Sequence, residues 1–387
     1  MRRPRLLVVA STFPGAPDDG TPAFVRDLAI RESQYFDTLV VAPRVPGASR
    51  SERLGPLEVV RFRYFPRRWE DLAHGAIIEN LHASRWRYLQ VLPFFVAETW
   101  AVWRAVATFR PDVLHVHWII PQGIVTTAVA RRVPAVVTTL GGDLYALNNA
   151  LLRAVKRRVL RHAGAVTVMN AQMRSIVVQL GARPDSVHIL PMGVELASFA
   201  GPRRARPAGP LRVLFVGRLV EKKGLAILLE ALGGVDGVRL TVVGDGPLRA
   251  ALARQAAGLA VTFVGQVGRS QLAALYRDHD VVATPSVPAA SGDQDGLPVA
   301  LLEAMASGCA VVASDLPGIN EVIEDGVSGV LLPPGDVQAL RDAIARLAHD
   351  VDATAALGAA ARRRVENYSV GRRGEQYATL LRSVAGG

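Results

Sequence analysis

Short runs of β-branched and other apolar residues alternate along the chain with longer amphipathic stretches whose apolar residues recur at helical spacing. This alternation is typical of parallel sheets wrapped by helices, so the pattern predicts an α/β fold. Before residue 200 the predicted strands are "RLLVVAS", "TLVVAP", "LEVVRFRYF", "VLHVHW", "AVVTTLG", "AVTVMN" and "VHILP". After residue 210 they are "LRVLFVG", "RLTVVG", "VTFVG", "VVATPS", "AVVASD" and "GVLLPP".

A segment rich in Pro, Gly and Arg separates the two groups of strands. This segment, "AGPRRARPAGP" (residues 200–210), has no apolar period and reads as a linker. We therefore predict two Rossmann-like, doubly wound domains that face each other across a cleft, an N-terminal one over 1–199 and a C-terminal one over 211–370. The last helix and tail, 371–387, are expected to pack back toward the N-terminal domain. Ligands of such sheets bind at the carboxyl ends of the strands, so the cleft is the expected active site.

The composition indicates a folded protein with a large core, because 50% of the 387 residues are hydrophobic and only 20% are charged. The single cysteine, Cys309, excludes an intramolecular disulfide, reads as a buried small residue and fits a reducing cytoplasm. The apolar run in the opening "MRRPRLLVVAS" is too short for the core of a secretory signal. The most hydrophobic stretch, Tyr88–Phe109, is interrupted by Pro93, Glu98 and Arg104 and falls short of a membrane span. We expect a soluble or peripheral protein.

Positive charge is concentrated in the first half of the chain. Residues 1–200 hold 25 Lys or Arg against 15 Asp or Glu, whereas residues 201–387 hold 20 against 19. A basic half indicates an anionic partner such as nucleic acid, acidic lipid or a phosphorylated acceptor. The segment "RFRYFPRRW" (Arg61–Trp69) combines basic and aromatic residues, but no nucleic-acid recognition motif accompanies it.

A second basic segment, Leu144–Gly164, is predicted to form one amphipathic helix with Leu152, Val155 and Val159 on its apolar face. Two interpretations stay open. The helix either docks this face on its own sheet and exposes its charges to water, or lies on an anionic lipid surface. The charged residues expected around the rest of the helix are Arg153, Lys156, Arg157, Arg158 and Arg161.

The C-terminal half carries three motifs that suit a phosphorylated ligand. In "VGRLVEKKG", Gly217 ends a strand and is followed by Arg218 and Lys223. The guanidinium of Arg218 can bind a diphosphate with two hydrogen bonds, and the ammonium of Lys223 supplies a compact positive charge. A solvated basic turn is the alternative, although two of the three lysines of the chain lie here. Two further loops that follow strands, at Gly244 and at Gly265 to Val267, offer backbone groups to a phosphate or a base.

The segment "DQDGLPVALLEAMASG" contains three acids that pair in two ways. Asp293 and Asp295 form an Asp-x-Asp, which is typical of a clamp for a divalent metal. Alternatively, Asp295 lies in a loop at the mouth of a helix that begins near Pro298, and Glu303 lies about two turns into that helix. Backbone amides at the mouth, from Gly296 and Leu297, favour an anion. A nucleotide sugar satisfies both features, because its phosphate suits the amides and its hydroxyls suit the carboxylates.

These motifs together resemble the retaining glycosyltransferases of family 4, which have the two-domain GT-B fold. Asp295 and Glu303 match the acid-x7-Glu signature of that family, with Asp where Glu is usual. Gly217, Arg218, Lys223 and Gly224 match its Gly-Arg and Lys-Gly elements. The likeness covers nearly the whole chain and includes "STFPGAPDDGTPAFVRDLA", "DVLHVHWIIPQG", "ILPMGV" and "LPGINEVIEDGVSGVLLPPGD".

The resemblance implies roles for individual residues. Arg218 and Lys223 would hold the donor diphosphate and Asp295 would orient the transferred sugar, so these three are the predicted catalytic residues. Glu303 would bind the ribose hydroxyls. The other predicted donor-binding residues are Gly20, Thr21, Gly217, Gly244, Gly265, Val267, Gly296, Leu297 and Pro298. The family transfers without a metal held by Asp-x-Asp, so no metal and no cofactor are expected.

The chain departs from the family at one position of the first domain. Where the family usually has His-Gly-x-Asp, this sequence has Leu140 in place of the histidine and keeps Gly141 and Asp143. We assign these three residues to the acceptor and sugar pocket. Elsewhere, His115 and His117 alternate along a predicted strand, so we expect one to face the core and one the edge of the cleft; without a third ligand they make no metal site.

The sequence therefore predicts a retaining, metal-independent glycosyltransferase that moves a sugar from a nucleoside diphosphate sugar to a glycan or lipid-linked acceptor. Its expected location is the cytoplasm or the inner face of the cell membrane, with an anionic membrane surface as a partner of the basic domain and no nucleic acid. Leu140 leaves two alternatives open. The chain is either a catalytically weak nucleotide-sugar-binding protein or an enzyme whose pocket packs the methyl group of a 6-deoxy sugar.

Overall fold

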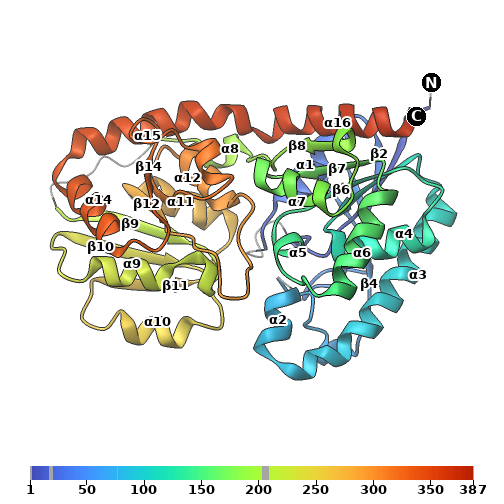
Figure 1. The fold of residues 1–387 in the computed structure, drawn as a ribbon, viewed down its shortest axis with the longest axis horizontal. Helices are drawn as coiled ribbons and strands as arrows, with labels where there is room; N and C mark the ends of the chain where they lie inside the picture. Colours follow the sequence, from blue (N-terminus) through green and yellow to red (C-terminus); the bar gives the residue numbers. More distant parts are fainter. Residues whose placement is uncertain (1, 17–20, 76, 203–208, 387) are drawn as a thin grey trace. The chain divides into compact units, whose positions relative to one another are not determined.

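The computed structural model describes residues 2–16, 21–75, 77–202 and 209–386, which form two compact units (Figure 1). The first unit comprises Met1–Met192 and Val370–Gly387, and the second comprises Gly193–Ser369. Each unit is a twisted, mainly parallel sheet covered by helices. The predicted α/β class and the two Rossmann-like domains are therefore confirmed.

The sheet of the first unit has eight strands in the order β3-β4-β2-β1-β5-β6-β7-β8. All neighbouring pairs are parallel except β3 with β4, which is an antiparallel hairpin at one edge. The central strands β1 and β5 are almost wholly buried because helices cover both faces of the sheet. The strands are β1 (Arg5–Val9), β2 (Asp37–Pro43), β3 (Ser51–Leu54), β4 (Leu57–Phe62), β5 (Val113–His117), β6 (Ala135–Thr138), β7 (Ala165–Val168) and β8 (Val187–Ile189).

The last helix of the chain packs on this first sheet. Tyr377 of this helix is fully buried, and its hydroxyl donates a hydrogen bond to the carbonyl oxygen of Leu190 at 2.7 Å. The helices of the first unit are α1 (Phe24–Glu32), α2 (Ile77–Ala83), α3 (Val91–Phe109), α4 (Ile124–Val129), α5 (Gly142–Tyr145), α6 (Ala150–His162), α7 (Ala171–Gln179) and α16 (Val370–Gly386).

The sheet of the second unit has six parallel strands in the order β11-β10-β9-β12-β13-β14. The strands are β9 (Leu211–Val216), β10 (Val238–Val243), β11 (Val261–Gly265), β12 (Val281–Thr284), β13 (Ala310–Ser314) and β14 (Val330–Leu332). Alternate residues of β9 serve two separate cores, with Val213 and Phe215 on one face and Leu214 on the other. The helices are α8 (Leu196–Phe199), α9 (Leu225–Leu232), α10 (Arg249–Gln255), α11 (Arg269–Asp278), α12 (Val299–Ala306), α13 (Ile319–Val322), α14 (Val337–His349) and α15 (Val351–Val365).

The division between the units falls earlier than the linker expected at residues 200–210. The chain leaves the first unit after Met192, and Phe199 is already fully buried in the core of the second unit. The proline- and arginine-rich segment therefore connects α8 to β9 within the second unit, although its residues 203–208 lie outside the described residues. In the described part of the chain, no helix is both long and apolar enough to cross a membrane.

Candidate functional site

The loops at the carboxyl edge of the second sheet pack backbone against backbone. The amide of Gly244 donates a hydrogen bond to the carbonyl oxygen of Gly265 at 2.8 Å. A Cβ atom on Gly244 would lie 2.0 Å from the carbonyl oxygen of Gly217, and one on Gly246 would lie 2.5 Å from that of Leu219. Since no side chain fits at Gly244 or Gly246, these glycines bring the loops after β9, β10 and β11 into direct contact. Three of the predicted donor-binding glycines thus belong to one continuous edge.

A short helical turn, η5 (Glu221–Lys223), follows β9 and is tied to the loop between β12 and α12. Gly224 ends the turn with a φ of +68°, and a Cβ atom there would lie 1.7 Å from the carbonyl oxygen of Pro285. The Glu221 carboxylate accepts a hydrogen bond from the amide of Ala290 at 3.0 Å. These contacts fix the lysines of η5 against the loop that carries the acids.

Each acid of the Asp-x-Asp sequence contacts a lysine. Lys223 Nζ lies 2.6 Å from Asp295 Oδ2, and Lys222 Nζ lies 2.8 Å from Asp293 Oδ2 and 3.8 Å from Asp295 Oδ1. Burial raises the pKa of Asp295, but the charges of Lys223 and Lys222 outweigh it and hold this pKa below its usual value. Asp295 is therefore a largely buried carboxylate that stays ionised because two ammonium groups face it.

Glu303 is positioned by a tyrosine that sequence patterns did not identify. Glu303 lies in α12, which begins at Val299 directly after Pro298, as the composition predicted. The hydroxyl of Tyr276 lies within donating distance of Glu303 Oε2, at 3.2 Å, and of the carbonyl oxygen of Ala300, at 3.1 Å, so these two acceptors share its one proton. Burial, followed by the charge of Glu303, raises the pKa of Tyr276 well above its usual value, so this hydroxyl stays protonated. Tyr276 thus holds the Glu303 side chain from inside the core.

The other predicted donor-binding residues lie around the same edge. Gly217 and Arg218 directly follow β9, Gly265 ends β11, and Gly296, Leu297 and Pro298 precede α12. Gly296 and Pro298 are buried, while Arg218 and Leu297 are half-buried. Val267 packs as a partly buried residue against the core beneath α11 and α12. Among the described residues, no group of three or more His, Cys, Asp or Glu is placed to hold a metal ion.

In the first unit, Asp143 organises the loop in which Leu140 lies. The Asp143 carboxylate accepts hydrogen bonds from the amide of Ile119 at 2.6 Å, the hydroxyl of Thr139 at 2.8 Å and the amide of Leu140 at 3.4 Å. Gly141 has a φ of +121° and directly precedes the short helix α5. Asp143 is buried under the loop, whereas Leu140 is half-buried. Leu140 is therefore better placed to meet a ligand than Asp143 or Gly141, which is also buried.

Two further predicted donor-binding residues, Gly20 and Thr21, come before α1 in the sequence. Thr21 is half-buried and precedes this helix. Gly20 lies outside the described residues.

The expectation that His115 and His117 face different environments is wrong. Residues two apart in a strand point to the same face, and both imidazoles are buried with their ring centroids 4.2 Å apart. His115 Nδ1 lies 2.7 Å from Glu32 Oε1, and its Nε2 lies 2.8 Å from Thr138 Oγ1. Burial lowers the pKa of His115 to about 3, so both contacts are made by a neutral ring. His115 is therefore a core residue with both nitrogens paired, whereas neither ring nitrogen of His117 finds a partner among the described residues.

The basic segment Leu144–Gly164 is not one continuous helix. Helix α5 ends at Tyr145, and α6 begins at Ala150 after Asn149, whose side chain accepts a hydrogen bond from the amide of Leu152. Lys156, expected on the charged face, is buried and donates to the carbonyl oxygens of Leu144 at 2.9 Å and Ala146 at 2.6 Å. This lysine satisfies carbonyl groups that have no helical partner because the helix is interrupted between α5 and α6. Its role is therefore internal, whereas the four arginines of the segment are exposed.

Sequence reasoning missed two residues of the candidate site, Lys222 and Tyr276. The scarcity of lysine in the chain pointed to Lys222 as well as to Lys223, but not to its ion pair with Asp293. Tyr276 gave no signal, since an aromatic residue in an amphipathic helix reads as part of the core. Both contact the side chains that are predicted to bind the donor, Lys222 that of Asp295 and Tyr276 that of Glu303.

The chain matches known families over most of its length. Residues 210–350 match the family described as Glycosyl transferases group 1, and residues 25–193 match the Glycosyl transferase 4-like domain. The amylovoran biosynthesis glycosyltransferase of Erwinia amylovora is 37% identical over 200 residues, which is 49% of this chain and 49% of that protein. The chain thus spans about half the length of this relative. The phosphatidyl-myo-inositol mannosyltransferase of Mycobacterium leprae is 37% identical over 274 residues, covering 66% of this chain and 70% of that protein.

A solved structure supports the same fold. Sucrose-phosphate synthase of Thermosynechococcus elongatus superposes with a TM-score of 0.80 at 21% sequence identity, and the match covers 99% of each chain. At this level of identity the similarity establishes the fold, which is that of the two-domain GT-B proteins.

Proposed function

The chain belongs to the family 4 glycosyltransferases, also described as glycosyl transferases group 1, and from this premise we propose that it transfers a sugar, with retention, from a nucleoside diphosphate sugar to an acceptor. The observation that carries the proposal is the ion pair between Lys223 and Asp295, at the carboxyl edge of the second sheet. An ammonium and a carboxylate side by side suit a donor that presents both phosphate oxygens and sugar hydroxyls.

The proposed chemistry is electrostatic. When the glycosidic bond to the diphosphate breaks, negative charge grows on the leaving phosphate oxygens. Lys223 and Arg218 stabilise this charge, and a positive group that is already held in place does so without costly reorganisation. Asp295 fixes the Lys223 ammonium and accepts hydrogen bonds from the hydroxyls of the sugar. Since the carboxylates of Asp293 and Asp295 are neutralised by lysines, we propose that these lysines serve in place of a metal ion.

Glu303 is proposed to bind the ribose of the nucleotide. Two adjacent hydroxyls of a ribose can both donate to one carboxylate, and Tyr276 restricts the rotation of that carboxylate from the opposite side. The glycines of the neighbouring loops let the backbone approach the base and the phosphates.

For the acceptor we propose a glycan or a lipid-linked sugar. The two relatives are named for amylovoran biosynthesis and for mannosyl transfer to phosphatidyl-myo-inositol, a glycan and a lipid respectively. The excess of Lys and Arg in residues 1–200 favours an acceptor that carries phosphate.

Selective stabilisation by one nucleoside diphosphate is the first test. We expect one of UDP, GDP, ADP or TDP, or its sugar, to raise the melting temperature equally with magnesium and with EDTA. A ligand at 100 times its Kd adds about 2.7 kcal/mol of stability to the state that binds it, which thermal unfolding detects readily. Stabilisation that requires magnesium would contradict the metal-free site, and the absence of a shift with every nucleotide would contradict the donor site itself.

A second candidate function, nucleotide-sugar binding with little transfer, rests on Leu140. We propose instead that Leu140 packs against the methyl group of a 6-deoxy sugar, because a leucine cannot donate to a hydroxyl but suits an apolar group. We expect the protein to use 6-deoxyhexose donors faster than hexose donors. Leu140→His should reverse the preference by roughly tenfold, and Leu140→Met, which stays apolar, should keep it. Donor competition assays measure both.

Faster transfer from hexoses than from 6-deoxyhexoses by the unaltered protein would contradict the pocket assigned to Leu140. Nucleotide binding without transfer from any donor would favour the binding protein.

A further inference from the structure

Helix α3 is apolar on two opposite faces, although only one of them packs on the sheet. Its inner face is buried and includes Phe94, Ala101, Val102 and Ala105, together with Glu98, whose pKa burial raises to about 8. A helix that is hydrophobic all round is expected inside a protein or a membrane. In the described part of the chain, however, the outer face of α3 carries large apolar side chains that stay exposed.

The outer face of α3 exposes large apolar side chains at helical spacing. Leu92 is 73% exposed, Val96 62%, Trp100 50% and Trp103 55%, and Leu89 of the preceding turn η2 (Arg85–Gln90) is 71% exposed. Leu92 and Trp103 are separated by about 16 Å along a helix that rises 1.5 Å per residue. We call these five residues the α3 face. Contiguous exposed apolar surface of this kind marks an interaction site.

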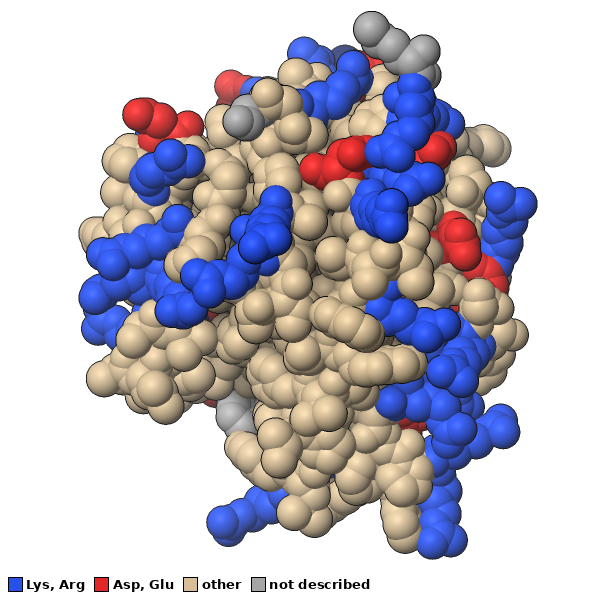
Figure 2. All heavy atoms as spheres, turned by 90° about the vertical axis from the view of Figure 1, so that its right-hand side faces the viewer, with Lys and Arg blue, Asp and Glu red and all other residues tan. Residues whose placement is uncertain are grey.

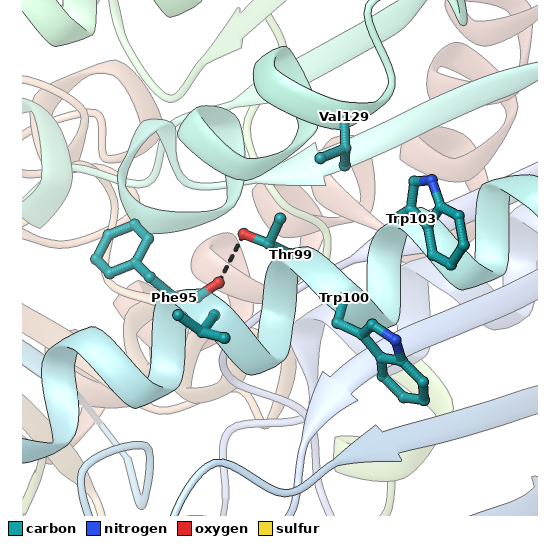
Figure 3. Close-up of a pocket in the computed structure, with 6 residues that line it drawn as sticks. Phe95, Thr99, Trp100, Trp103 and Val129 are labelled. Carbon is teal, nitrogen blue, oxygen red and sulfur yellow. Dashed lines mark hydrogen bonds between the residues drawn. The ribbon is translucent and has the colours of Figure 1, made fainter.

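The α3 face continues onto α4 through a shallow hollow of about 440 Å³. Figure 3 shows the indoles of Trp100 and Trp103 projecting from α3 and Val129 contributed by α4. Thr99, which also lines the hollow, donates its hydroxyl to the carbonyl oxygen of Phe95 at 2.6 Å and so presents no unsatisfied donor. The hollow is therefore apolar and open rather than a closed pocket for a polar ligand.

The exposed charged residues of the segment that carries the α3 face are arginines. Between residues 85 and 110 the acidic residue is Glu98, which is buried, while Arg85, Arg104 and Arg110 are exposed. The Arg104 guanidinium lies 5.6 Å from the ring centre of Trp100. Figure 2, which views the side where α3 and α4 lie in Figure 1, shows a broad uncharged area with Lys and Arg along its borders. Arg131 and Arg132, exposed just beyond α4, add to this charge.

We propose that the α3 face docks on the surface of an anionic lipid bilayer. Leucine, valine and tryptophan side chains suit the boundary between headgroups and acyl chains, and indoles favour that region in particular. The bordering arginines suit anionic headgroups, each contributing to attraction at the surface. A second copy of the chain is a poorer occupant, because pairing two α3 faces about a twofold axis brings arginines of like charge together.

This surface differs from the one that the sequence favoured for lipid contact. On α6 the apolar residues Val159 and Leu160 are buried, Leu152 and Val155 are half-buried, and Lys156 points inward. Helix α6 therefore docks its apolar face on its own unit. The exposed large apolar residue of α6 is Leu151, whereas the α3 face has five.

The proposal goes beyond sugar transfer and is testable without a donor, so its failure is separable from that of the proposed function. We expect the full chain to float with phosphatidylcholine vesicles that contain phosphatidylglycerol, to float less without it, and to be released by salt. Trp100→Ser with Trp103→Ser should lower the vesicle partition coefficient roughly tenfold or more. Arg85→Gln with Arg104→Gln should lower it roughly fivefold per arginine for anionic vesicles only.

Matched variants in the second unit serve as controls. Val327→Ser removes an apolar side chain of the second unit that is 52% exposed, and Arg362→Gln with Arg363→Gln removes two exposed arginines of α15. Both should float as the unaltered protein does, and circular dichroism and thermal unfolding should confirm that every variant folds. Undiminished flotation of the tryptophan variant would overturn the proposal. So would a dimer that this variant converts to a monomer, since a second copy would then cover the face.

Discussion

Replacing Lys223 with alanine is expected to lower the rate of sugar transfer by roughly a hundredfold or more, the usual cost of removing one preorganised group that stabilises charge in a transition state. The Lys223 ammonium lies 2.6 Å from Asp295 and is held by the turn that Gly224 ends. Its removal deprives the leaving diphosphate of a cation and leaves Lys222, at 3.8 Å, as the remaining lysine beside the Asp295 carboxylate. The measurement is kcat and kcat/KM with the donor that the nucleotide panel identifies.

Lys222→Ala is the matched control, because Lys222 is the adjacent lysine and contacts chiefly Asp293. We expect its effect on transfer to be several times smaller. The pKa of Asp295 offers a second readout: Lys223 is the main charge that holds it low, so it should rise in Lys223→Ala more than in Lys222→Ala. Equal losses of activity in the two variants would contradict the special role of Lys223, and unchanged transfer in Lys223→Ala would contradict the electrostatic mechanism.

Most of the fold was predictable because strand and helix patterns are local properties of the sequence. Every apolar run that was interpreted as a strand is a strand of one of the two sheets. The strand that was missed, β3, is a short edge strand whose residues are exposed or half-buried, so it carries no apolar run. The domain boundary was misplaced because a composition rich in Pro, Gly and Arg indicates only that a segment is irregular. The boundary itself depends on tertiary packing, since Phe199 is buried in the second unit.

The candidate site was predictable where chemistry and spacing act together, as for Lys223 with Asp295. It was not predictable where a partner comes from a distant core position, as Tyr276 does for Glu303. Lys156 shows the limit most clearly: its charge indicated a surface, but the break before α6 leaves carbonyl oxygens that only a buried donor satisfies. The position of a residue along a helix predicts which face it occupies. It does not predict that carbonyl groups of a neighbouring turn need a hydrogen-bond donor from that face.

Gly224→Ala is expected to destabilise the second unit by about 3 kcal/mol or more, which is among the larger effects of a single substitution. Two causes add up. A residue with a side chain at a φ of +68° costs about 1–2 kcal/mol in the left-handed region. In addition, the new Cβ atom would lie 1.7 Å from the carbonyl oxygen of Pro285, so the backbone of η5 or of the loop after β12 must move. Because η5 carries Lys223, nucleotide binding should weaken even where the protein remains folded.

Gly234→Ala separates the two causes. Gly234 also has a positive φ, +80°, but a Cβ atom there would meet no atom within 4 Å. Its substitution should therefore cost only the conformational term, about 1–2 kcal/mol, and leave nucleotide binding unchanged. Urea unfolding followed at the transition of the second unit measures both variants, because two units need not unfold together. If the two substitutions cost the same, the close contact between Gly224 and Pro285 does not hold η5 in place, and the position of Lys223 must depend on its ion pair with Asp295.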